Sequence, residues 1–432
     1  MRTTRTYHIE NVEEIKRKLL IWSKQFYEVV WLDSNSYPQN HKRFDAVLAV
    51  DAFTLIKTDS DDAFDKLKDY QENTKDWLFG YLTYDLKNDT ENLGSKNYDN
   101  LDFPDLFFFQ PKRLFMFNDN ELQIQYLNMI DDELDSDWEE IQQTTSFSEI
   151  SSEEIKVKLR ITKDQYFSKL NKMIDHIKRG DIYEANFCQE FFAINSKINP
   201  LEVYQNLNKI SSPPFATFLR LDDKFVISAS PERYVKKKGN KIISQPIKGT
   251  SKRSANPEED AALIAQLRSD EKERSENIMI VDLVRNDLSK TAAKGSVIVE
   301  ELCEIYTFKQ VHQMISTVTS EIPHTKSPVE VLRTTFPMGS MTGAPKVSAM
   351  KIIEELEETK RGIYSGSIGY FTPENDFDFN VIIRSILYNE TNQYISFSVG
   401  GAITAKSTPE KEYEECLIKA KAMRTVLEGD SN

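Results

Sequence analysis

The sequence predicts an α+β fold that is rich in strands. After a helical pattern at 10–30, short segments of aliphatic and aromatic residues follow one another before any further long helical stretch. The last two of these segments alternate apolar and polar residues around the turn Asn118-Asp119-Asn120, which is typical of a hairpin. We expect strands at 29–34, 45–50, 77–84, 114–117 and 122–126.

Helices and strands both occur in the remainder of the chain. The pattern predicts helices at about 163–179 (ending at Gly180), 257–285, from after Pro345 to about 358, and 409–427. It predicts strands at 225–229, 241–244, 364–371, 378–388 and 394–399. Residues 131–158 are acidic and rich in Ser and Thr, which indicates a solvated connector, helical in part at most. We therefore divide the chain into a strand-rich part at 1–150, interleaved with the rest, and a larger region at 151–432.

Composition excludes several classes of partner. The chain has 432 residues, 39% of them hydrophobic, and a net charge of -14 without a block of Lys and Arg. This argues against nucleic acid or an anionic membrane surface as a main partner. No apolar run approaches the roughly 18 residues of a membrane span, and the N-terminus lacks the apolar core of a signal peptide. The three cysteines are far apart, which favours a reduced, cytoplasmic protein.

One lysine stands out as a candidate nucleophile. An apolar strand at 241–244 runs into Pro246, Lys248 and what we expect to be a turn at Gly249-Thr250. Glycine there lets a ligand approach the backbone closely. A lysine amine attacks carbon once a pocket has removed its proton. A solvated surface lysine is the alternative for an isolated Lys-Gly pair, and the other segments decide between the two.

Two pairs of glutamates suggest a cation site. Glu273 and Glu276 are three residues apart on one predicted helix, and Glu412 and Glu415 repeat that spacing on the last helix. Residues three apart share a helix face, so two such helices offer carboxylates to one divalent cation. In a chain with 69 acidic residues such pairs also arise by chance.

Further polar residues lie beside glycines or apolar strands. The loop 339–346, which contains Ser340, enters a helix at a proline and either offers backbone N–H groups to an anion or is simply a well-capped helix start. Arg384 lies within a predicted apolar strand and must reach a partner or water; a carboxylate ligand is one candidate, and a structural ion pair is the alternative. Glu232 follows a strand and is a candidate general acid, or else an ordinary loop carboxylate.

Together these segments resemble the chorismate-utilising enzymes, a family that includes anthranilate synthase component I, aminodeoxychorismate synthase component I, isochorismate synthase and salicylate synthase. The order and spacing of the segments match over about 160–425. They are Ile182-Tyr183-Glu184-Ala185-Asn186, Ser230-Pro231-Glu232-Arg233, Pro246-Ile247-Lys248-Gly249-Thr250, Ile280 to Asp287, Gly339 to Lys346, Gly362-Ile363-Tyr364-Ser365-Gly366 and Glu412-Tyr413-Glu414-Glu415. The resemblance implies two large antiparallel sheets packed together with helices outside, and a chorismate-binding catalytic region at 151–432.

Within the family, Lys248 matches aminodeoxychorismate synthase, whereas anthranilate synthase usually has alanine there. Isochorismate and salicylate synthases have a lysine at the position of Glu184, so water addition is not expected here. The resemblance implies amination of chorismate at carbon 4 for 4-aminobenzoate and folate synthesis, with Lys248 as nucleophile and Glu232 as acid. It implies Mg²⁺ on Glu276 and Glu415, aided by Glu273 and Glu412. It implies substrate contacts from Gly249, Thr250, Ser340, Tyr364, Arg384, Gly401, Ala402 and Lys419.

The resemblance also implies a partner and leaves alternatives. Ammonia would come from a separate glutamine amidotransferase subunit, because the chain shows no Cys-His set or nucleophile elbow of its own. The nearest alternative is anthranilate synthase component I, in which Lys248 would be a bystander. The alternative from another class is a non-catalytic chorismate-binding regulatory protein, which would have no need of a proton donor at Glu232.

Overall fold

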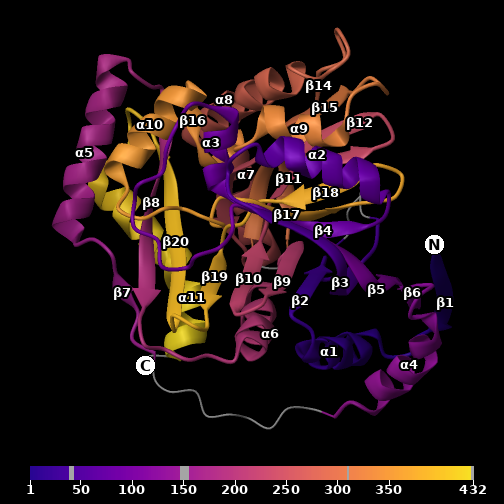
Figure 1. The fold of residues 1–432 in the computed structure, drawn as a ribbon. Helices are drawn as coiled ribbons and strands as arrows, with labels where there is room; N and C mark the ends of the chain where they lie inside the picture. The colour runs from indigo at the N-terminus through magenta and orange to yellow at the C-terminus, as the bar shows by residue number, and fades with distance from the viewer. Residues whose placement is uncertain (38–42, 146–154, 309–310, 430–432) are drawn as a thin grey trace.

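The computed structural model describes residues 1–37, 43–145, 155–308 and 311–429. Antiparallel strands form its centre and the helices lie mainly outside them (Figure 1). The helices are α1 (Val12–Trp22), α2 (Ala63–Thr74), α3 (Lys87–Thr90), α4 (Leu134–Gln143), α5 (Lys163–Arg179), α6 (Pro200–Ser211), α7 (Pro257–Ser269), α8 (Glu271–Ser289), α9 (Pro328–Thr335), α10 (Lys346–Leu356) and α11 (Pro409–Glu428). Short 3₁₀ turns are η1 (Ser23–Gln25), η2 (Tyr84–Leu86), η3 (Asp131–Glu133) and η4 (Gly339–Met341).

The strands are connected by hydrogen bonds into one network. They are β1 (Arg2–His8), β2 (Glu28–Asp33), β3 (Ala46–Thr58), β4 (Leu78–Leu82), β5 (Leu106–Asn118), β6 (Glu121–Leu127), β7 (Lys158–Leu159), β8 (Glu184–Ala193), β9 (Phe215–Leu221), β10 (Lys224–Ser230), β11 (Arg233–Lys238), β12 (Lys241–Gln245), β13 (Ile247–Lys252), β14 (Ile298–Thr307), β15 (Val311–Glu321), β16 (Gly343–Ala344), β17 (Ser367–Phe371), β18 (Phe377–Asn380), β19 (Ser385–Asn389) and β20 (Tyr394–Ile403).

The long strands β3 and β5 join two halves of this network. One half runs β8-β20-β19-β10-β9-β2-β3, and the other runs β5-β4-β17-β18-β11-β12-β15. The pairs β2–β9 and β4–β17 link strands from the first 150 residues to later ones. Every pairing between these strands is antiparallel, so the predicted α+β class with packed antiparallel sheets is confirmed.

Two hydrophobic cores hold the layers together. The first lies where α1, α4, α5, α6, α10 and α11 cover one face of the sheet, and it contains Trp31, Phe117 and Phe397. The second lies between the two halves and under α2, α8 and α9, and it contains Phe79 and Phe379. These side chains are nearly fully buried. Burial of so many aromatic and aliphatic groups supplies the main driving force for folding.

Most predicted elements are present with small changes in their bounds. The hairpin is β5–β6, the helix at 163–179 is α5, and Gly180 ends it in a left-handed conformation (φ +84). Part of the acidic connector forms α4, and its residues 146–154 lie outside the described part of the chain. The helix expected at 10–30 is shorter, because Ser23–Gln25 forms a 3₁₀ turn before β2.

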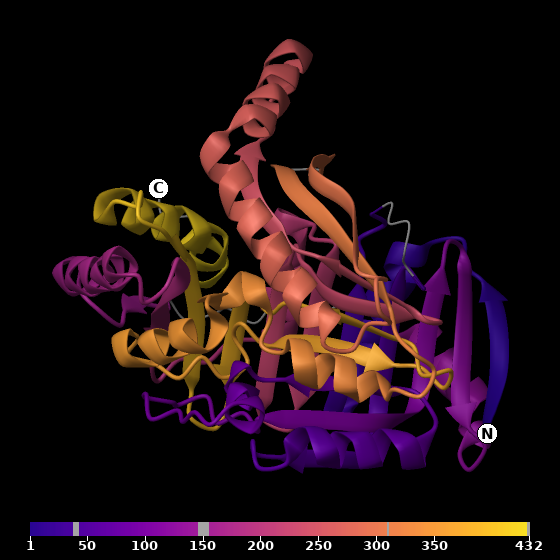
Figure 2. The ribbon, with the colours of Figure 1, turned by 90° about the horizontal axis from the view of Figure 1, so that it is seen from above.

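The long helix expected at 257–285 is wrong in one respect. It is two helices, α7 and α8, separated by Asp270 in an extended conformation. The Asp270 carboxylate accepts the backbone N–H groups of Lys272 and Glu273 at 2.9 and 3.0 Å. This cap starts a new helix where the pattern suggested continuity. Figure 2 shows the pair of helices projecting from the body of the molecule.

Two other expectations need correction near the predicted site. The strand expected at 378–388 is two strands, and Arg384 lies between them with φ +54. Backbone bonds from Val381 to Glu232 and from Ile382 to Gly366 draw the chain away from its sheet neighbours. The expected Gly249-Thr250 turn is part of β13, in which the register against β15 shifts between Ile247 and Thr250.

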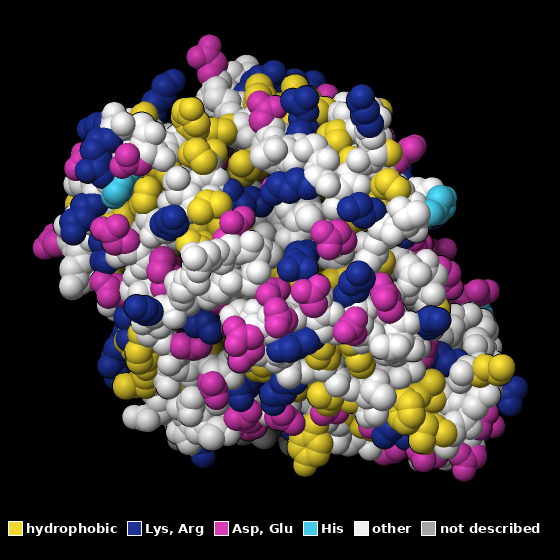
Figure 3. All heavy atoms as spheres, turned by 45° about the horizontal axis from the view of Figure 1, so that its top comes forward, with side chains coloured by type: hydrophobic (Ala, Val, Ile, Leu, Met, Phe, Trp, Pro, Cys, Tyr) yellow, Lys and Arg dark blue, Asp and Glu magenta, His cyan; other side chains and the backbone are white. Residues whose placement is uncertain are grey.

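Acidic and basic side chains are interspersed over the face shown in Figure 3, and hydrophobic ones form only small groups on it. The net charge of -14 is thus not gathered into one visible patch on that face. Within the described ranges, no helix combines the length and apolar character that crossing a bilayer requires.

Candidate active site

Glu232 is buried immediately after β10. The turn that carries it is fixed by Ser230, whose hydroxyl donates to the Val381 carbonyl at 2.6 Å and accepts the Glu232 N–H at 3.2 Å. Burial raises the pKa of Glu232 to about 7, although a hydrogen bond with Ser340, the charge of Lys248 and a backbone hydrogen bond from Ile247 oppose the rise. A carboxyl group with such a pKa is suited to donate a proton near neutral pH.

Lys248 lies in an irregular part of β13. The register shift opposite β15 leaves Lys248 and Gly249 unmatched, as in a β-bulge, and Gly249 has φ +90. A side chain at Gly249 would be strained, and its Cβ would lie 3.2 Å from Glu273. The bulge therefore turns the backbone beside Lys248 toward α8.

The charge of Lys248 reaches carboxyl groups from four different elements. It acts to lower the pKa values of Glu184, Glu232, Glu276 and Glu415. Glu184 begins β8, Glu276 is on α8 and Glu415 is on α11. The fold thus brings the predicted nucleophile close enough to the predicted acid and to both predicted metal-binding helices for its charge to act on their carboxyl groups.

The two glutamate pairs face each other across α8 and α11. Burial raises the pKa values of Glu273, Glu276 and Glu412, and repulsion from neighbouring glutamates adds to the effect. Burial acts in the same direction on Glu415, but Lys419, whose Nζ is 2.6 Å from its Oε1, brings the pKa of Glu415 below the usual value. The pairs therefore form a crowded acidic cluster.

The chemistry of this cluster fits a hard divalent cation. The buried Oε1 of Glu276 has no hydrogen-bond partner, and the Lys272 ammonium lies 3.7 Å from Glu276 and 4.0 Å from Glu412. Carboxylate oxygens are the preferred ligands of Mg²⁺. Among the described residues, however, no three His, Cys, Asp or Glu side chains approach closely enough to hold a metal ion in their present positions. The metal set thus stays a prediction.

Several predicted substrate-binding residues lie beside this cluster. Lys419 Nζ donates to the Gly400 carbonyl at 2.8 Å, and a Cβ at Gly401 would lie 3.4–3.6 Å from Glu412, Glu415 and Lys419. Arg384 Nη1 donates to the Lys419 carbonyl at 3.4 Å. Ala402 follows in β20, opposite Asn186 of β8.

Other predicted residues complete the surroundings. Ser340 is buried in η4 and bonds to Glu232. Tyr364 is buried and its hydroxyl is 3.4 Å from Cys188 Sγ. Burial lowers the pKa of Arg384, while the charges of Tyr364 and Glu415 oppose that shift. Thr250 is exposed on β13 opposite Gln313, at the margin of this group.

The predicted set omitted two residues of the neighbourhood. Glu184 is 2% exposed, and its Oε2 has no hydrogen-bond partner. Burial raises the pKa of Glu184, and Lys248 opposes the rise. Lys272 was also omitted, although it precedes Glu276 by one helical turn. A carboxylate at the start of a strand rich in aromatic residues and a lysine four residues before a glutamate were the available signals.

Comparison with known proteins agrees with this geometry. The model of the chorismate binding enzyme family matches residues 27–425. The chain is 37% identical over 357 residues to an anthranilate synthase component I-like protein of Synechocystis sp., covering 82% of this chain and 73% of that protein. It is 34% identical over 361 residues to aminodeoxychorismate synthase component 1 of Bacillus subtilis, covering 81% and 76%. Aminodeoxychorismate synthases of Oryza sativa and Streptomyces griseus are longer, and the chain spans 30% and 37% of them.

A solved structure has the same fold. Anthranilate synthase component I from Streptococcus pneumoniae superimposes with a TM-score of 0.79 at 27% identity, over 90% of this chain and 95% of that one. The predicted family resemblance is therefore confirmed over nearly the whole sequence, including the segments that carry Glu232, Lys248, Glu276 and Glu415. This chain belongs to the chorismate binding enzyme family.

Proposed function

We propose that the protein is an aminodeoxychorismate synthase component I, which aminates chorismate at carbon 4 to 4-amino-4-deoxychorismate. The observation that carries the proposal is the position of Lys248, whose charge acts on Glu232 and on carboxylates of α8 and α11. A lysine beside a buried acid suits covalent displacement of a hydroxyl group. Relatives named aminodeoxychorismate synthase support this assignment.

The chain's own residues would perform the displacement in two steps. The unprotonated Lys248 amine bonds to carbon 2 of chorismate, both ring double bonds shift, the bond from carbon 4 to its hydroxyl oxygen breaks, and Glu232 gives its proton to that oxygen, which leaves as water. Ammonia then bonds to carbon 4, the double bonds return, the lysine amine is released from carbon 2, and the proton that the added nitrogen gives up restores the protonated Glu232. Glu232 is suited to the first step because its pKa of about 7 keeps much of it protonated near neutrality.

Binding groups would hold the dianionic substrate in place. Arg384, Tyr364 and the backbone near Gly401 and Ala402 would hold the side-chain carboxylate, and Thr250, Ser340 and Lys419 would make further contacts. Mg²⁺, held by Glu276 and Glu415 and through water by Glu273 and Glu412, would neutralise the ring carboxylate. The unpartnered Glu276 oxygen and the crowded glutamates support this role.

Ammonia would be supplied by a separate glutamine amidotransferase subunit, and the product would feed 4-aminobenzoate and folate synthesis. The name of the Bacillus subtilis relative, "component 1", is consistent with a second component. We place the reaction in the cytoplasm; the three cysteines, all unpaired and buried, suit a reducing compartment.

The test is incubation with chorismate, Mg²⁺ and ammonium at mildly alkaline pH, with products identified by mass spectrometry. We expect aminodeoxychorismate without pyruvate. Anthranilate together with pyruvate would instead establish anthranilate synthase component I, the second candidate, which the similarity to anthranilate synthase proteins favours. Binding of chorismate without turnover would make the protein a regulatory chorismate-binding protein.

A further inference from the structure

A buried ion pair outside the predicted site joins Arg361 to Glu357. Arg361 Nε donates to Glu357 Oε2 at 2.9 Å, and Nη2 donates to Oε1 at 2.7 Å. Each residue is 6% exposed. α10 ends at Leu356, so the pair stands in the connection between α10 and β17. A two-bond arrangement of this kind fixes the orientation of the guanidinium group.

The same pair binds the backbone of two other segments. Arg361 Nη1 donates to the Met341 carbonyl at 2.7 Å, and Nη2 donates to the Asn186 carbonyl at 2.8 Å. Glu357 Oε1 also accepts the backbone N–H of Cys188 at 2.9 Å. Met341 directly follows Ser340 in η4, whereas Asn186 and Cys188 belong to β8. The ion pair therefore ties the η4 loop to β8.

Asn186 reinforces this connection. Its Nδ2 donates to the Ser340 carbonyl at 3.1 Å, and its backbone N–H donates to the Thr342 carbonyl at 2.8 Å. The Ser340 carbonyl is thus bound by Asn186 of β8, and the carbonyl of the next residue, Met341, is bound by Arg361. Ser340 and Glu232 line the same cavity, and hydrogen bonding from the Ser340 side chain acts to lower the pKa of Glu232. The position of the Ser340 hydroxyl depends on the backbone that Arg361 holds.

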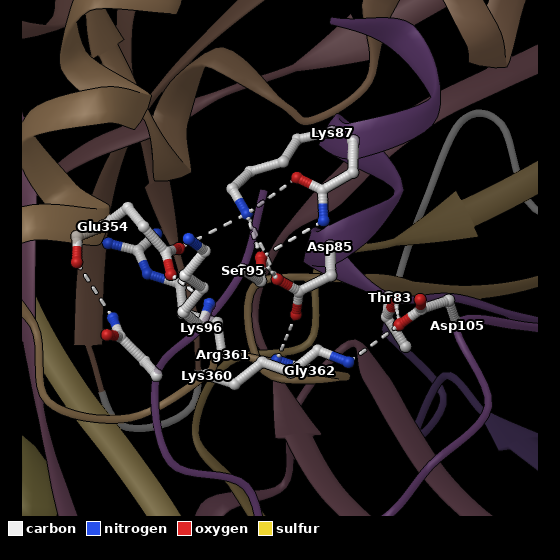
Figure 4. Close-up of polar contacts among 12 residues, drawn as sticks. Thr83, Asp85, Lys87, Ser95, Lys96, Asp105, Glu354, Lys360, Arg361 and Gly362 are labelled. Carbon is white, nitrogen blue, oxygen red and sulfur yellow. Dashed lines mark hydrogen bonds and ion pairs between the residues drawn. The ribbon is translucent and has the colours of Figure 1, made fainter. Parts of the chain in front are cut away.

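The segment that carries Arg361 is itself anchored from the other side. The Arg361 guanidinium lies 4.5 Å from the centre of the Tyr84 ring. The Gly362 N–H donates to Asp85 Oδ2 at 2.9 Å, and Asp85 pairs with Lys87 at 3.2 Å (Figure 4). Arg361 is thus held between this network and the η4 loop.

The burial of the pair indicates a positional role. Removing two charges from water costs free energy that their attraction only partly returns. Apolar side chains of similar volume therefore often stabilise a fold at least as much as a buried ion pair does. Here, however, the four hydrogen bonds of the Arg361 side chain in the described structure end on Glu357 or on carbonyls of the η4 loop and β8. An apolar side chain could make none of them.

We propose that Arg361, with Glu357, is a positioning residue that fixes the η4 loop against β8 and so keeps the Ser340 hydroxyl directed at Glu232. The inference rests on the proposed function of Glu232 as the acid. It extends that function to residues that touch neither substrate nor Glu232.

The charged and polar groups around Glu232 determine how its pKa would change if the η4 loop were displaced. Lys248 acts on it from β13, Ser340 faces it from η4, and Ile247 contributes a backbone N–H. Asp287 of α8 lines the cavity that Glu232 and Ser340 also line. The Asp287 carboxylate is paired with Lys290 and Lys346. The neighbouring Arg233 is paired with Asp378. Loss of the Ser340 bond removes an influence that lowers the pKa of Glu232, so that pKa should rise.

The experiment compares Arg361→Lys with Ser340→Ala. Lysine keeps the positive charge but cannot make the four bonds of the guanidinium. We expect kcat to fall about tenfold, KM for chorismate to change by less than about threefold, and the alkaline limb of the kcat profile to move up by about one pH unit. Ser340→Ala should give the same shift, and the double variant should add little to it, because both changes remove one interaction.

A matched control is Arg113→Lys. Arg113 is equally buried and pairs with Asp51, Glu133 and Asp137, far along the chain from the site. This variant should lose stability but keep the pH profile. If Arg361→Lys lowers the melting temperature in the same way and leaves kcat and the alkaline limb unchanged, the pair is only structural and the proposal is overturned.

A second readout separates this proposal from the proposed function. Carboxyl ¹³C NMR with Glu232→Gln as the assignment standard reports the titration of Glu232 without turnover. An upward shift in both Arg361→Lys and Ser340→Ala supports the positioning role, even for a protein that makes no aminodeoxychorismate. An unchanged Glu232 titration in Arg361→Lys, beside a shifted one in Ser340→Ala, overturns it.

Discussion

The ammonium of Lys272 on α8 lies 4.0 Å from the carboxylate of Glu412 on α11. Burial acts to lower the pKa of Lys272, yet Glu276, Glu412, Glu273 and Glu415 together raise it. The side chain thus places a positive charge where two acidic helix faces meet. Such a charge relieves repulsion among the glutamates, and it would compete with a metal ion for the same oxygens.

We expect Lys272→Gln to bind Mg²⁺ several-fold more tightly than the wild type, about threefold to tenfold, because the competing cation is gone. In metal-free buffer the same variant should melt at a lower temperature, since the glutamates lose their counter-charge. Calorimetric titration and thermal melting provide the measurements. Lys294→Gln, at an exposed position after α8, is the control, and equal behaviour of the two variants would contradict the prediction.

Neutralising one carboxylate of the cluster should change the Mg²⁺ affinity and the metal-free melting temperature in the opposite directions. We expect Glu276→Gln and Glu415→Gln each to weaken Mg²⁺ binding by about tenfold or more, because each removes a charged ligand. Glu276→Gln should also raise the melting temperature without metal, since the pKa of Glu276 is raised and its charge is therefore unfavourable in the folded protein.

Glu414→Gln is the matched control for the metal experiment, because Glu414 precedes Glu415 on α11 and is exposed. Isothermal titration with Mg²⁺ alone tests the set without requiring activity. Unaltered Mg²⁺ affinity in both Glu276→Gln and Glu415→Gln would remove these residues from the metal site.

Replacement of the proposed nucleophile should separate catalysis from binding. We expect Lys248→Ala to lower ammonia-dependent product formation by at least about a thousandfold, because the covalent route is lost. Chorismate and Mg²⁺ should still bind. Lys252→Ala, at an exposed position on the same strand, should behave like the wild type. A normal rate in Lys248→Ala would exclude the covalent role and favour the anthranilate synthase alternative.

The proposed acid should leave its signature in the pH profile. At constant free ammonia, kcat/KM should fall above pH 7, because the pKa of Glu232 is about 7 and the proton must be present. Glu232→Gln should lose most of the activity at every pH. A profile that is flat from pH 6 to 9 would show that Glu232 is not the acid.

The same residue links stability to pH. Because the folded-state pKa of Glu232 lies above its ordinary value of 4.5, the folded protein binds this proton more tightly than the unfolded chain. Its contribution to stability is present below pH 4.5 and is lost as pH rises through about 7. Glu232→Gln should therefore melt above the wild type at pH 8 and approach it near pH 4.5.

The sequence by itself predicted the strand-rich α+β class, the hairpin and the family. Alternating apolar residues, a glycine after α5 and the motif around Lys248 are local patterns, and they act through backbone preferences and side-chain chemistry that a short segment already contains. The same holds for the spacing of Glu273 with Glu276 and of Glu412 with Glu415, since helix geometry places such pairs on one face.

Two other features departed from the predicted pattern, the first through a local helix cap and the second through a contact with a distant part of the chain. Asp270 ends α7 and starts α8 through its own hydrogen bonds, against a pattern that looked continuous. Arg384 leaves the expected strand because Val381 bonds to Glu232, a residue almost 150 positions earlier. Local propensity is a weak determinant where tertiary hydrogen bonds compete with it.

Only the tertiary structure decided which charges share a site. It brought the Lys248 charge to Glu184, Glu232, Glu276 and Glu415, and it buried Arg361 against Glu357 and two carbonyls. The raised pKa of Glu232 follows from that burial and not from its neighbours in sequence. Sequence thus determined which reactive groups the protein has, whereas folding determined their distances and their exposure to water, on which their protonation depends.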